Sequence, residues 1–404
     1  MPDKDKMRIA YLVTHPIQYQ APLLKRLSRE SDIDLTVFFC SDFSVKGFQD
    51  PGFGKQIQWD VPLLEGYKYE FLSAICKTDR VDFWRPFNYG LAKRMRMGHF
   101  DVLWVHGYGR LYNLIAIEIA RRSRVKVLLR DEATLISAKR SFLKKALKSL
   151  LFRWLKSRVD VFLAIGSLNQ EYYRFYRIPD EKIFLMPYAV DNDFFRKKSI
   201  DVSQKREELR KSLGLEPGRP VILYASKMID RKRPLDLLEA YIRLSIDGRS
   251  DPVPYLIFIG DGEMRHVSEE KIAHLGWSSV RFLGFKNQSE LPSYYDLCDV
   301  FVLPSIDEPW GLVVNEVMNA GRAVIVSDQV GCGADLVRNG ENGYVFNARN
   351  IEELYGSLSD ALQTQEHCRK LGENGLEIIN KWGFEEDIKG LKDAIRHALG
   401  ENEK

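Results

Sequence analysis

Residues 308–316 read Glu308-Pro309-Trp310-Gly311-Leu312-Val313-Val314-Asn315-Glu316, and they say more about the chain than any other stretch. They follow an apolar run, Val300–Ser305, that is typical of a strand, and they lead into a helical pattern through Met318 and Ala320. The free backbone N–H groups at such a helix start form a site for an anion, and the flanking carboxylates accept hydrogen bonds from neutral hydroxyl groups. A phosphate beside sugar hydroxyls therefore fits this arrangement. An acidic helix start, stabilised by the helix dipole, explains each glutamate separately but not their combination.

Short apolar runs alternate with amphipathic helical stretches along the whole chain, which predicts a parallel α/β architecture. The expected strands of the first half are Arg8–Val13, Leu35–Cys40, Val102–His106, Val125–Arg130, Val159–Ile165 and Ile183–Pro187. Those of the second half are Val221–Ser226, Tyr255–Ile259, Val280–Leu283, Val300–Pro304, Ala323–Ser327 and Gly343–Phe346. Most are apolar on both faces, as in a sheet that helices cover on both sides. We expect two doubly wound, Rossmann-like domains that bind ligands in a cleft at their strand ends.

Composition limits the class of protein. The chain has 404 residues, of which 45% are hydrophobic and 29% charged, and its formal net charge is +4. This length holds two or three domains, and so small a net charge does not indicate a nucleic-acid partner. The cysteines are dispersed without a C-x-x-C pair, which indicates reduced thiols in the cytoplasm and no metal cage. No apolar run reaches the roughly eighteen residues that a membrane-spanning helix needs.

The stretch 308–316 resembles the E-x7-E motif of retaining GT-B glycosyltransferases of family 4. Three segments before it follow the order of that family: the basic loop Tyr224–Arg233, the turn Gly260–Gly262 and the pair Gly284-Phe285. The segment after it, Asn319–Val337, is similar to the small-residue turn, strand and glycine loop of the family. The resemblance covers about Val221 to Phe346, and it implies the GT-B fold of two Rossmann-like domains.

The resemblance also implies a nucleotide-sugar site in the second domain. Lys227 and Lys232 are expected to neutralise the diphosphate of the leaving nucleotide, so that no bound metal or other cofactor is needed. Lys227 stands where the family usually has arginine, and it keeps the charge without the bidentate geometry. Glu308 is expected to hold hydroxyls of the donor sugar, and Glu316 those of the ribose. Backbone N–H groups for sugar and phosphate are expected from Gly311, Leu312 and Val313.

Domain boundaries follow from a change in composition between the two sets of strands. Residues 196–220 are rich in lysine, arginine and glutamate with Gly-Pro breaks, and we interpret them as a linker. The N-terminal, acceptor-binding domain then covers residues 1–195, and the nucleotide-sugar domain covers 221–384. The last helical stretch, residues 385–404, is expected to return to the N-terminal domain, as it does in GT-B proteins.

The first domain matches the family less closely. His106 ends an expected strand and precedes a glycine-containing segment, and this position predicts a catalytic role for His106 together with Glu308. His15 and Gln18 lie in the loop after the first strand, where many relatives have a glycine-rich loop. Both are candidates for contact with the acceptor or a phosphate, and a packed loop histidine explains His15 equally well.

Arg130 and Asp131 follow another strand of the first domain and are also candidates for contact with the acceptor. Relatives often have histidine where Arg130 stands, close to the reacting sugar. The usual catalytic assignment therefore does not transfer to this position. Capping of the following helix is an alternative explanation for the acidic residues Asp131 and Glu132.

A basic amphipathic helix is expected over residues 138–158, which contain no acidic residue. Leucine and tryptophan recur on one side of it at helical spacing: Leu143, Leu147, Leu150, Leu151 and Trp154. Such a helix suits an anionic membrane surface, and we expect contact with the inner face of the cell membrane. The alternative is an ordinary helix with its apolar stripe buried against the sheet.

The sequence thus predicts a cytoplasmic, retaining, metal-independent glycosyltransferase. It would move a sugar from a nucleotide-diphosphate sugar to a hydroxyl of a glycan acceptor, in the synthesis of a lipid-linked glycan or a cell-surface polysaccharide. Two alternatives stay open. One is a non-catalytic, membrane-associated binding protein of the same fold, and the other is a phosphorylase or synthase of that fold.

Overall fold

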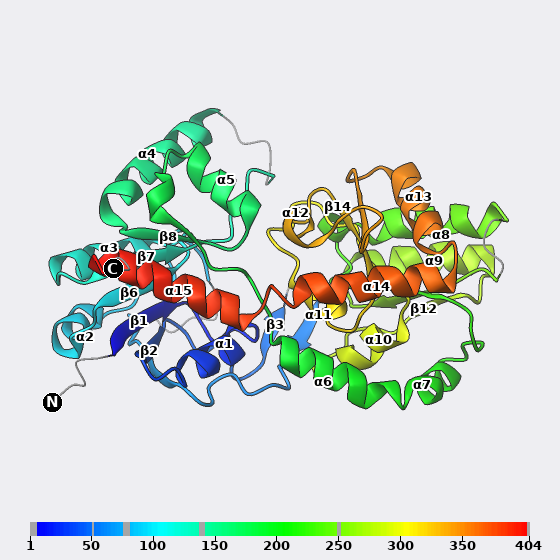
Figure 1. The fold of residues 1–404 in the computed structure, drawn as a ribbon, viewed down its shortest axis with the longest axis horizontal. Helices are drawn as coiled ribbons and strands as arrows, with labels where there is room; N and C mark the ends of the chain where they lie inside the picture. The colour runs from blue at the N-terminus through cyan, green and yellow to red at the C-terminus, as the bar shows by residue number, and fades with distance from the viewer. Residues whose placement is uncertain (1–5, 51, 76–80, 137–141, 249–251, 402–404) are drawn as a thin grey trace. The chain divides into compact units, whose positions relative to one another are not determined.

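A computed structural model describes residues 6–50, 52–75, 81–136, 142–248 and 252–401, and its elements form two compact units (Figure 1). The first unit comprises Met1–Phe48, Val61–Tyr188 and Phe384–Lys404. The second comprises Gln49–Asp60 and Ala189–Gly383. Each unit is therefore built from segments that are distant in the sequence.

The first unit contains a parallel sheet of seven strands in the order β5-β2-β1-β6-β7-β8-β9. Its strands are β1 (Met7–Val13), β2 (Ile33–Phe39), β5 (Lys68–Phe71), β6 (Val102–His106), β7 (Lys126–Arg130), β8 (Val161–Ala164) and β9 (Ile183–Leu185). In the register of the sheet, Leu12 lies opposite Phe38 on one side and Val105 on the other. Every strand expected in the first half is present, and β5 is an additional edge strand.

Helices cover both faces of this sheet. One face packs against α1 (Gln20–Leu27) and α15 (Phe384–Leu399), and the other against α2 (Leu91–Gly98), α3 (Leu111–Arg122), α4 (Phe142–Arg158) and α5 (Ser167–Phe175). The C-terminal helix α15 buries Ile388, Leu391 and Ile395 in the core of the first unit. It approaches β9 so closely that a Cβ on Gly390 would lie 2.0 Å from the carbonyl oxygen of Leu185.

The second unit contains a parallel sheet of six strands in the order β12-β11-β10-β13-β14-β15. They are β10 (Val221–Ala225), β11 (Tyr255–Ile259), β12 (Val280–Phe282), β13 (Val300–Leu303), β14 (Ala323–Ser327) and β15 (Gly343–Phe346). The helices of this sheet are α8 (Pro234–Ile246), α9 (Met264–Leu275), α10 (Leu291–Leu297), α11 (Leu312–Met318), α12 (Gly333–Leu336), α13 (Ile351–Ala361) and α14 (Gln365–Ile379). The four central strands are fully buried, as their apolar sequences predict.

The expected linker at residues 196–220 is instead largely helical and belongs to the second unit. Its helices are α6 (Asn192–Ser203) and α7 (Arg206–Ser212). The carboxylate of Asp191 caps α6 by accepting a hydrogen bond from the N–H of Phe194 at 2.9 Å. Arg206 on α7 forms an ion pair with the buried Asp296 at the end of α10. The charged composition of this segment therefore reflects surface helices and an anchoring ion pair.

A two-stranded hairpin was not predicted from the sequence. It consists of β3 (Phe48–Asp50) and β4 (Lys55–Ile57), and from Gln49 to Asp60 it belongs to the second unit. The segment lies early in the chain, between strands of the first unit, and yet its contacts are with the second.

Candidate functional site

The central feature of the second unit is an ion pair between Lys232 and Glu308. The ammonium of Lys232 contacts Glu308 Oε2, and Arg231 Nη1 lies 3.8 Å from the same oxygen. Lys232 ends the short helix η2 (Asp230–Lys232) after β10, and Glu308 lies after β13. Because β10 and β13 are parallel neighbours, the segments that follow them meet at one edge of the sheet. The fold thus brings together two residues that the sequence assigned to the same ligand.

Burial shapes the electrostatics of this pair. The side chains of Lys232 and Glu308 are only 11% and 12% exposed. Burial lowers the pKa of Lys232, the carboxylate of Glu308 opposes that change, and the charges of Arg231 and Lys227 add to it. Two cations, Lys232 and Arg231, therefore lie near one carboxylate, and together they leave positive charge available for an anionic ligand.

Glu316 lies on α11, one residue beyond Asn315, and is buried. Tyr295 of α10 donates a hydrogen bond of 2.5 Å to its Oε2. Burial raises the pKa of Glu316 to about 7, and the hydroxyl of Tyr295 partly opposes the change. Its contact with ribose hydroxyls stays a prediction. The partner Tyr295 gave no signal in the sequence, because it comes from a different helix.

The start of α11 supplies the backbone groups that the sequence predicted. Gly311 has φ +95°, a left-handed conformation that favours glycine. A Cβ there would also lie 3.0 Å from side-chain carbons of both Leu303 and Val330. Leu312 and Val313 follow as the first helical residues, and the first N–H groups of a helix have no partner inside it. Glycine is thus required at the turn that presents these donors.

Lys227 lies in the loop after β10 and has a partner that the sequence did not reveal. Its ammonium is 2.8 Å from both carboxylate oxygens of Asp50, in the hairpin. The side chain of Lys227 is 32% exposed, whereas that of Asp50 is 12% exposed. The two residues are far apart in sequence, so only the tertiary structure shows the contact.

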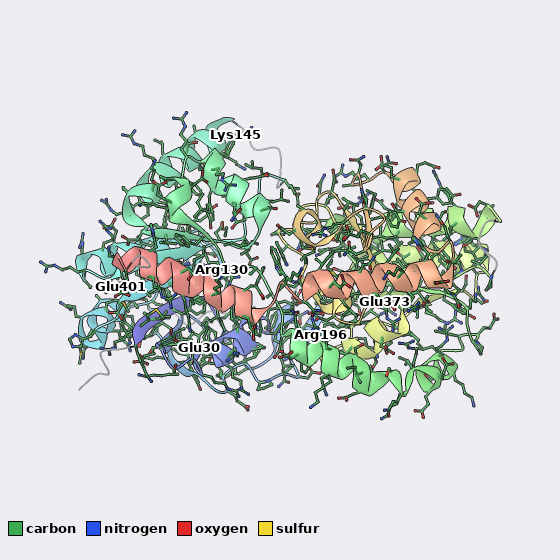
Figure 2. The ribbon with its side chains drawn as sticks, viewed as in Figure 1. Glu30, Arg130, Lys145, Arg196, Glu373 and Glu401 are labelled. Carbon is green, nitrogen blue, oxygen red and sulfur yellow. The ribbon has the colours of Figure 1, made fainter. Side chains whose placement is uncertain are left out.

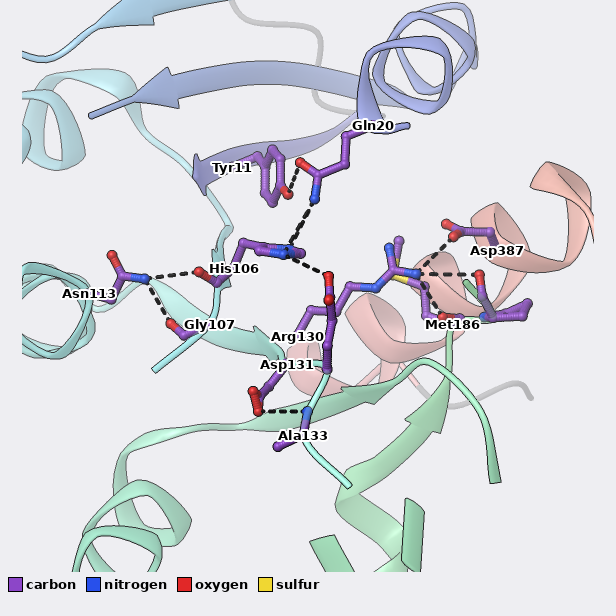
Figure 3. A network of polar contacts seen from close by, with 12 residues as sticks. Tyr11, Gln20, His106, Gly107, Asn113, Arg130, Asp131, Ala133, Met186 and Asp387 are labelled. Carbon is purple, nitrogen blue, oxygen red and sulfur yellow. Dashed lines mark hydrogen bonds and ion pairs between the residues drawn. The ribbon is translucent and has the colours of Figure 1, made fainter. Parts of the chain in front are cut away.

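The first unit holds a separate polar network around His106 (Figure 3). The amide of Gln20 lies 3.3 Å from His106 Nδ1, and its oxygen accepts a 2.8 Å hydrogen bond from the hydroxyl of Tyr11. On the other side, His106 Nε2 is 3.5 Å from a carboxylate oxygen of Glu132. Burial raises the pKa of Glu132, but contacts with His106, Tyr188 and Arg130 together hold it below its usual value.

This network orients His106 between an amide and a carboxylate. Asn113 adds to its fixation by donating hydrogen bonds to the carbonyl oxygens of His106, at 2.9 Å, and Gly107, at 2.8 Å. The side chain of His106 remains 16% exposed. The arrangement is suited to a histidine that carries or passes a proton. Gln20 and Glu132 were not predicted as its partners, although Gln20 follows the loop that holds His15 and Gln18, and Glu132 is adjacent to Asp131.

Arg130 is buried in the first unit. Its guanidinium is buried and forms an ion pair of 3.2 Å with Asp387 of α15 (Figure 3). It also donates to the carbonyl oxygens of Met186 and Pro187, at 3.0 and 3.3 Å. Arg130 therefore joins α15 to the interior of the first unit, and this placement gives no support to the acceptor role expected of it.

Asp131 and the two loop candidates are at least half-buried. Burial raises the pKa of Asp131 to about 6, while the charge of Lys148 opposes the change. The ring of His15 packs 4.2 Å from that of Phe43, and burial together with Arg110 and His106 lowers its pKa to about 3. The Oε1 atom of Gln18 is buried and, within the part of the chain that the structure describes, lacks a hydrogen-bond partner. Contact of these residues with an acceptor stays a prediction.

Helix α4 differs from the expected amphipathic helix in the side that it buries. Phe152 and Leu155 are fully buried, whereas Leu147 and Leu150 are 59% and 61% exposed. Lys148 lies over aromatic rings, at 4.8 Å from that of Tyr172. Lys145 extends outward from the helix (Figure 2). The residues 138–141 lie outside the described part of the chain. Among the described residues, no helix is long and apolar enough to cross a bilayer.

A known family matches this chain. Its description is glycosyl transferases group 1, and the match covers residues 205–377, within the second unit. The match spans most of the second unit. The family resemblance that the motifs of the second unit predicted is therefore confirmed, while the retaining mechanism stays a prediction.

Relatives support the same assignment along more of the chain. An uncharacterised glycosyltransferase of Methanocaldococcus jannaschii is 25% identical over 246 residues, which are 60% of this chain and 57% of that protein. EpsD of Bacillus subtilis, a candidate glycosyltransferase, is 26% identical over 383 residues, or 88% of this chain and 95% of that protein. The chain thus spans just over half the length of the first relative and nearly all of the second.

A solved structure shows the same fold. Alr3699/HepE of Anabaena, in complex with UDP and glucose, superposes with a TM-score of 0.69 at 17% identity, and the match covers 96% of this chain and 99% of that one. At this sequence identity, the similarity shows a shared fold and nothing more. The predicted GT-B architecture, with two Rossmann-like units, is confirmed.

Proposed function

We propose that the chain transfers a sugar from a nucleotide-diphosphate sugar to a hydroxyl group of a glycan acceptor. The observation that carries this proposal is the meeting of Lys232 with Glu308 in the unit that matches the group 1 glycosyltransferases, with Lys227 in the same loop. HepE, which shares the fold, was solved with UDP and glucose, and this supports a nucleotide-diphosphate sugar as the donor.

Cationic side chains suit the chemistry of the leaving group. When the bond between sugar and diphosphate breaks, negative charge develops on the departing diphosphate, and ammonium groups held in place stabilise it. Lys227 and Lys232 are the residues that we propose for this task, in place of a metal ion. Glu308 would accept hydrogen bonds from hydroxyls of the donor sugar and Glu316 from those of the ribose.

We assign the chemical step mainly to Glu308 and His106, with retention of configuration at the sugar. The contacts of His106 with Gln20 and Glu132 hold its ring in a defined orientation. Replacing Glu132 by glutamine, which keeps the shape of the side chain, tests whether this orientation matters. A role through His106 predicts a lower kcat with little change in the KM for the donor.

The acceptor is proposed to be a lipid-linked or surface glycan, because α4 offers a surface suited to an anionic membrane. Its exposed leucines Leu147 and Leu150 lie among exposed lysines, including Lys144 and Lys145, on a helix without acidic residues. Apolar side chains surrounded by cations are the pattern of helices that lie on anionic lipid.

The donor site is tested by a thermal-shift panel of UDP-, GDP-, ADP- and TDP-sugars, with and without EDTA. A ligand at a hundred times its Kd stabilises the folded state by about 2.7 kcal/mol. We expect one nucleotide class to raise Tm, to do so equally in EDTA, and to lose its effect in Lys232→Met. A shift that EDTA abolishes would contradict the metal-independent proposal. Turnover with inorganic phosphate in place of a glycan would favour a phosphorylase.

A further inference from the structure

The hairpin from Gln49 to Asp60 covers the loops that we assign to the donor. Its Asp50 binds Lys227. The carbonyl oxygen of Gly52 is so close to Gly262, in the G-x-G turn, that a Cβ on Gly262 would lie 2.9 Å from it. The ring of Phe53 meets that of Phe285 with centroids 4.9 Å apart. Three of the segments that the family resemblance gave to the nucleotide sugar are thus contacted by a single hairpin.

The contact between Asp50 and Lys227 is an ion pair. Both oxygens of Asp50 lie 2.8 Å from the ammonium, which also lies 4.9 Å from the centre of the Phe53 ring. A carboxylate and a phosphate offer the same kind of partner to an ammonium, because both present anionic oxygen acceptors. The carboxylate of Asp50 therefore sits where an oxygen of the diphosphate would have to be to use this lysine.

The contact with Lys227 lies in a small hairpin. Each of its strands has three residues, and two-stranded hairpins are marginally stable by themselves. Other polar contacts of the hairpin involve partly exposed groups: Lys55 with Asp261, at 2.8 Å, Asp60 with Ser289, and the carbonyl oxygen of Gln58 with Asn287, at 2.8 Å. Lys227 is 32% exposed and has a flexible side chain that can leave Asp50, while the N–H groups of Gly52 and Phe53 hold the carboxylate in place.

We propose that Asp50 is an internal competitor of the donor diphosphate and thereby sets the affinity for the donor. Its carboxylate neutralises Lys227 in the free protein, and the diphosphate displaces it on binding. Only a ligand with its own negative charge can make this exchange without leaving the lysine unpaired. The inference rests on the proposed function, because it takes Lys227 as a cation that binds the diphosphate.

Asp50→Asn is the decisive variant. The N–H groups of Gly52 and Phe53 donate to Asp50 Oδ1, at 2.8 and 3.2 Å, and asparagine keeps this acceptor while removing the charge. The measurement is the Kd of the nucleoside diphosphate that stabilises the wild-type protein most, obtained by calorimetric titration. Loss of a partly exposed ion pair predicts a Kd about threefold to tenfold lower in Asp50→Asn.

Two further variants test whether the change in Kd arises from the contact between Asp50 and Lys227. In a Lys227→Met background, Asp50→Asn is expected to leave Kd unchanged, because the carboxylate then has no ammonium to hold. Asp60→Asn removes a charge from the same hairpin but leaves Asp50 on Lys227, so its Kd is expected to stay within twofold of the wild-type value.

Each outcome has a separate meaning. A Kd in Asp50→Asn that is unchanged or higher overturns the inference, since Asp50 would then be structural or would assist binding. An equal gain in Asp60→Asn also overturns it, because loosening of the hairpin would be the cause. Wild-type protein that binds no nucleotide at all overturns the proposed function and this inference with it, whereas tight wild-type binding without an effect of Asp50 overturns the inference alone.

Discussion

At the scale of single residues, the candidate donor site depends on charges that are buried next to one another. Lys232 and Glu308 are each nearly nine-tenths buried, so each relies on the other to offset the loss of water. A site of this kind holds its charges in place before the ligand arrives, and such preorganisation lets charges stabilise a transition state.

The pair can be tested by removing one partner. Lys232→Met leaves the carboxylate of Glu308 without its nearest cation, and we expect the free energy of unfolding to fall by about 3 kcal/mol. The double variant Lys232→Met/Glu308→Gln should recover most of that loss, because no unpaired charge remains. Denaturant unfolding of the wild-type protein and the two variants measures both values. A double variant less stable than Lys232→Met would contradict this account.

Glu316 predicts a dependence of stability on pH. Its pKa in the folded protein is about 7, above the usual value near 4.5, so the folded state holds a proton that the unfolded state has lost between these pH values. Stability from this group is therefore full below about pH 4.5 and falls as pH rises to 7. Relative to Glu316→Gln, the wild-type protein should lose on the order of 3 kcal/mol between pH 4 and pH 8.

The measurement is urea unfolding at both pH values, with Glu373→Gln as the control. Glu373 lies on the exposed side of α14, where removal of a charge should leave the difference from wild type nearly constant. Parallel pH profiles for the wild-type protein and Glu316→Gln would show that this carboxyl group is not buried as described.

The sequence predicted residues that lie in motifs and missed those that reach them from elsewhere. Lys232 and Glu308 could be paired in advance because both belong to a family pattern with a fixed order. Asp50, Tyr295 and Glu132 could not, because their contacts depend on how distant segments pack and not on local spacing. The partner of Arg130 was missed for the same reason, since Asp387 lies 257 residues further along the chain.

At the scale of elements, the buried strands were the most predictable part of the fold. A strand covered on both faces is a continuous apolar run, and all twelve such runs in the sequence became strands. The exceptions follow the same rule. The edge strand β5 and the hairpin strands β3 and β4 are partly exposed and short, so they lack that pattern. Helices α6 and α7 were taken for a linker because they are charged.

We predict that the ion pair between Asp387 and Arg130 anchors helix α15 in the first unit. Asp387→Ala leaves the guanidinium of Arg130 buried without a carboxylate, and this should lower the free energy of unfolding by about 3–5 kcal/mol. Glu385→Ala, an exposed position in the first turn of the same helix, should change it by less than about 0.5 kcal/mol. Thermal or denaturant unfolding compares the two. Similar losses for both would mean that the ion pair does not fasten α15.

Helix α4 yields a prediction about binding to anionic membranes. We expect the protein to pellet with vesicles that contain anionic lipid, and to do so less as salt is added, because charge contributes to the attraction. The variant Leu147→Ser/Leu150→Ser should weaken pelleting without loss of stability, since both side chains are exposed. No pelleting of the wild-type protein at low salt would contradict a membrane contact through α4.

At the scale of the whole molecule, each unit contains a segment from the other half of the chain. The last helix belongs to the first unit, and a hairpin from the N-terminal part of the chain belongs to the second. Composition and periodicity indicated two domains, and the family resemblance indicated the returning helix. The hairpin gave no such signal, and it is the segment that we connect with control of donor affinity.

The central claim is that this molecule breaks the bond between sugar and diphosphate with retention of configuration. NMR observation of slow donor hydrolysis tests it most directly, because water then serves as the acceptor and the anomer first released is seen before it equilibrates. Our account predicts that an α-linked donor releases the α-sugar, in the presence of EDTA, and that Glu308→Gln loses this activity. Early release of the β-sugar, or no cleavage of any donor that binds, would contradict it.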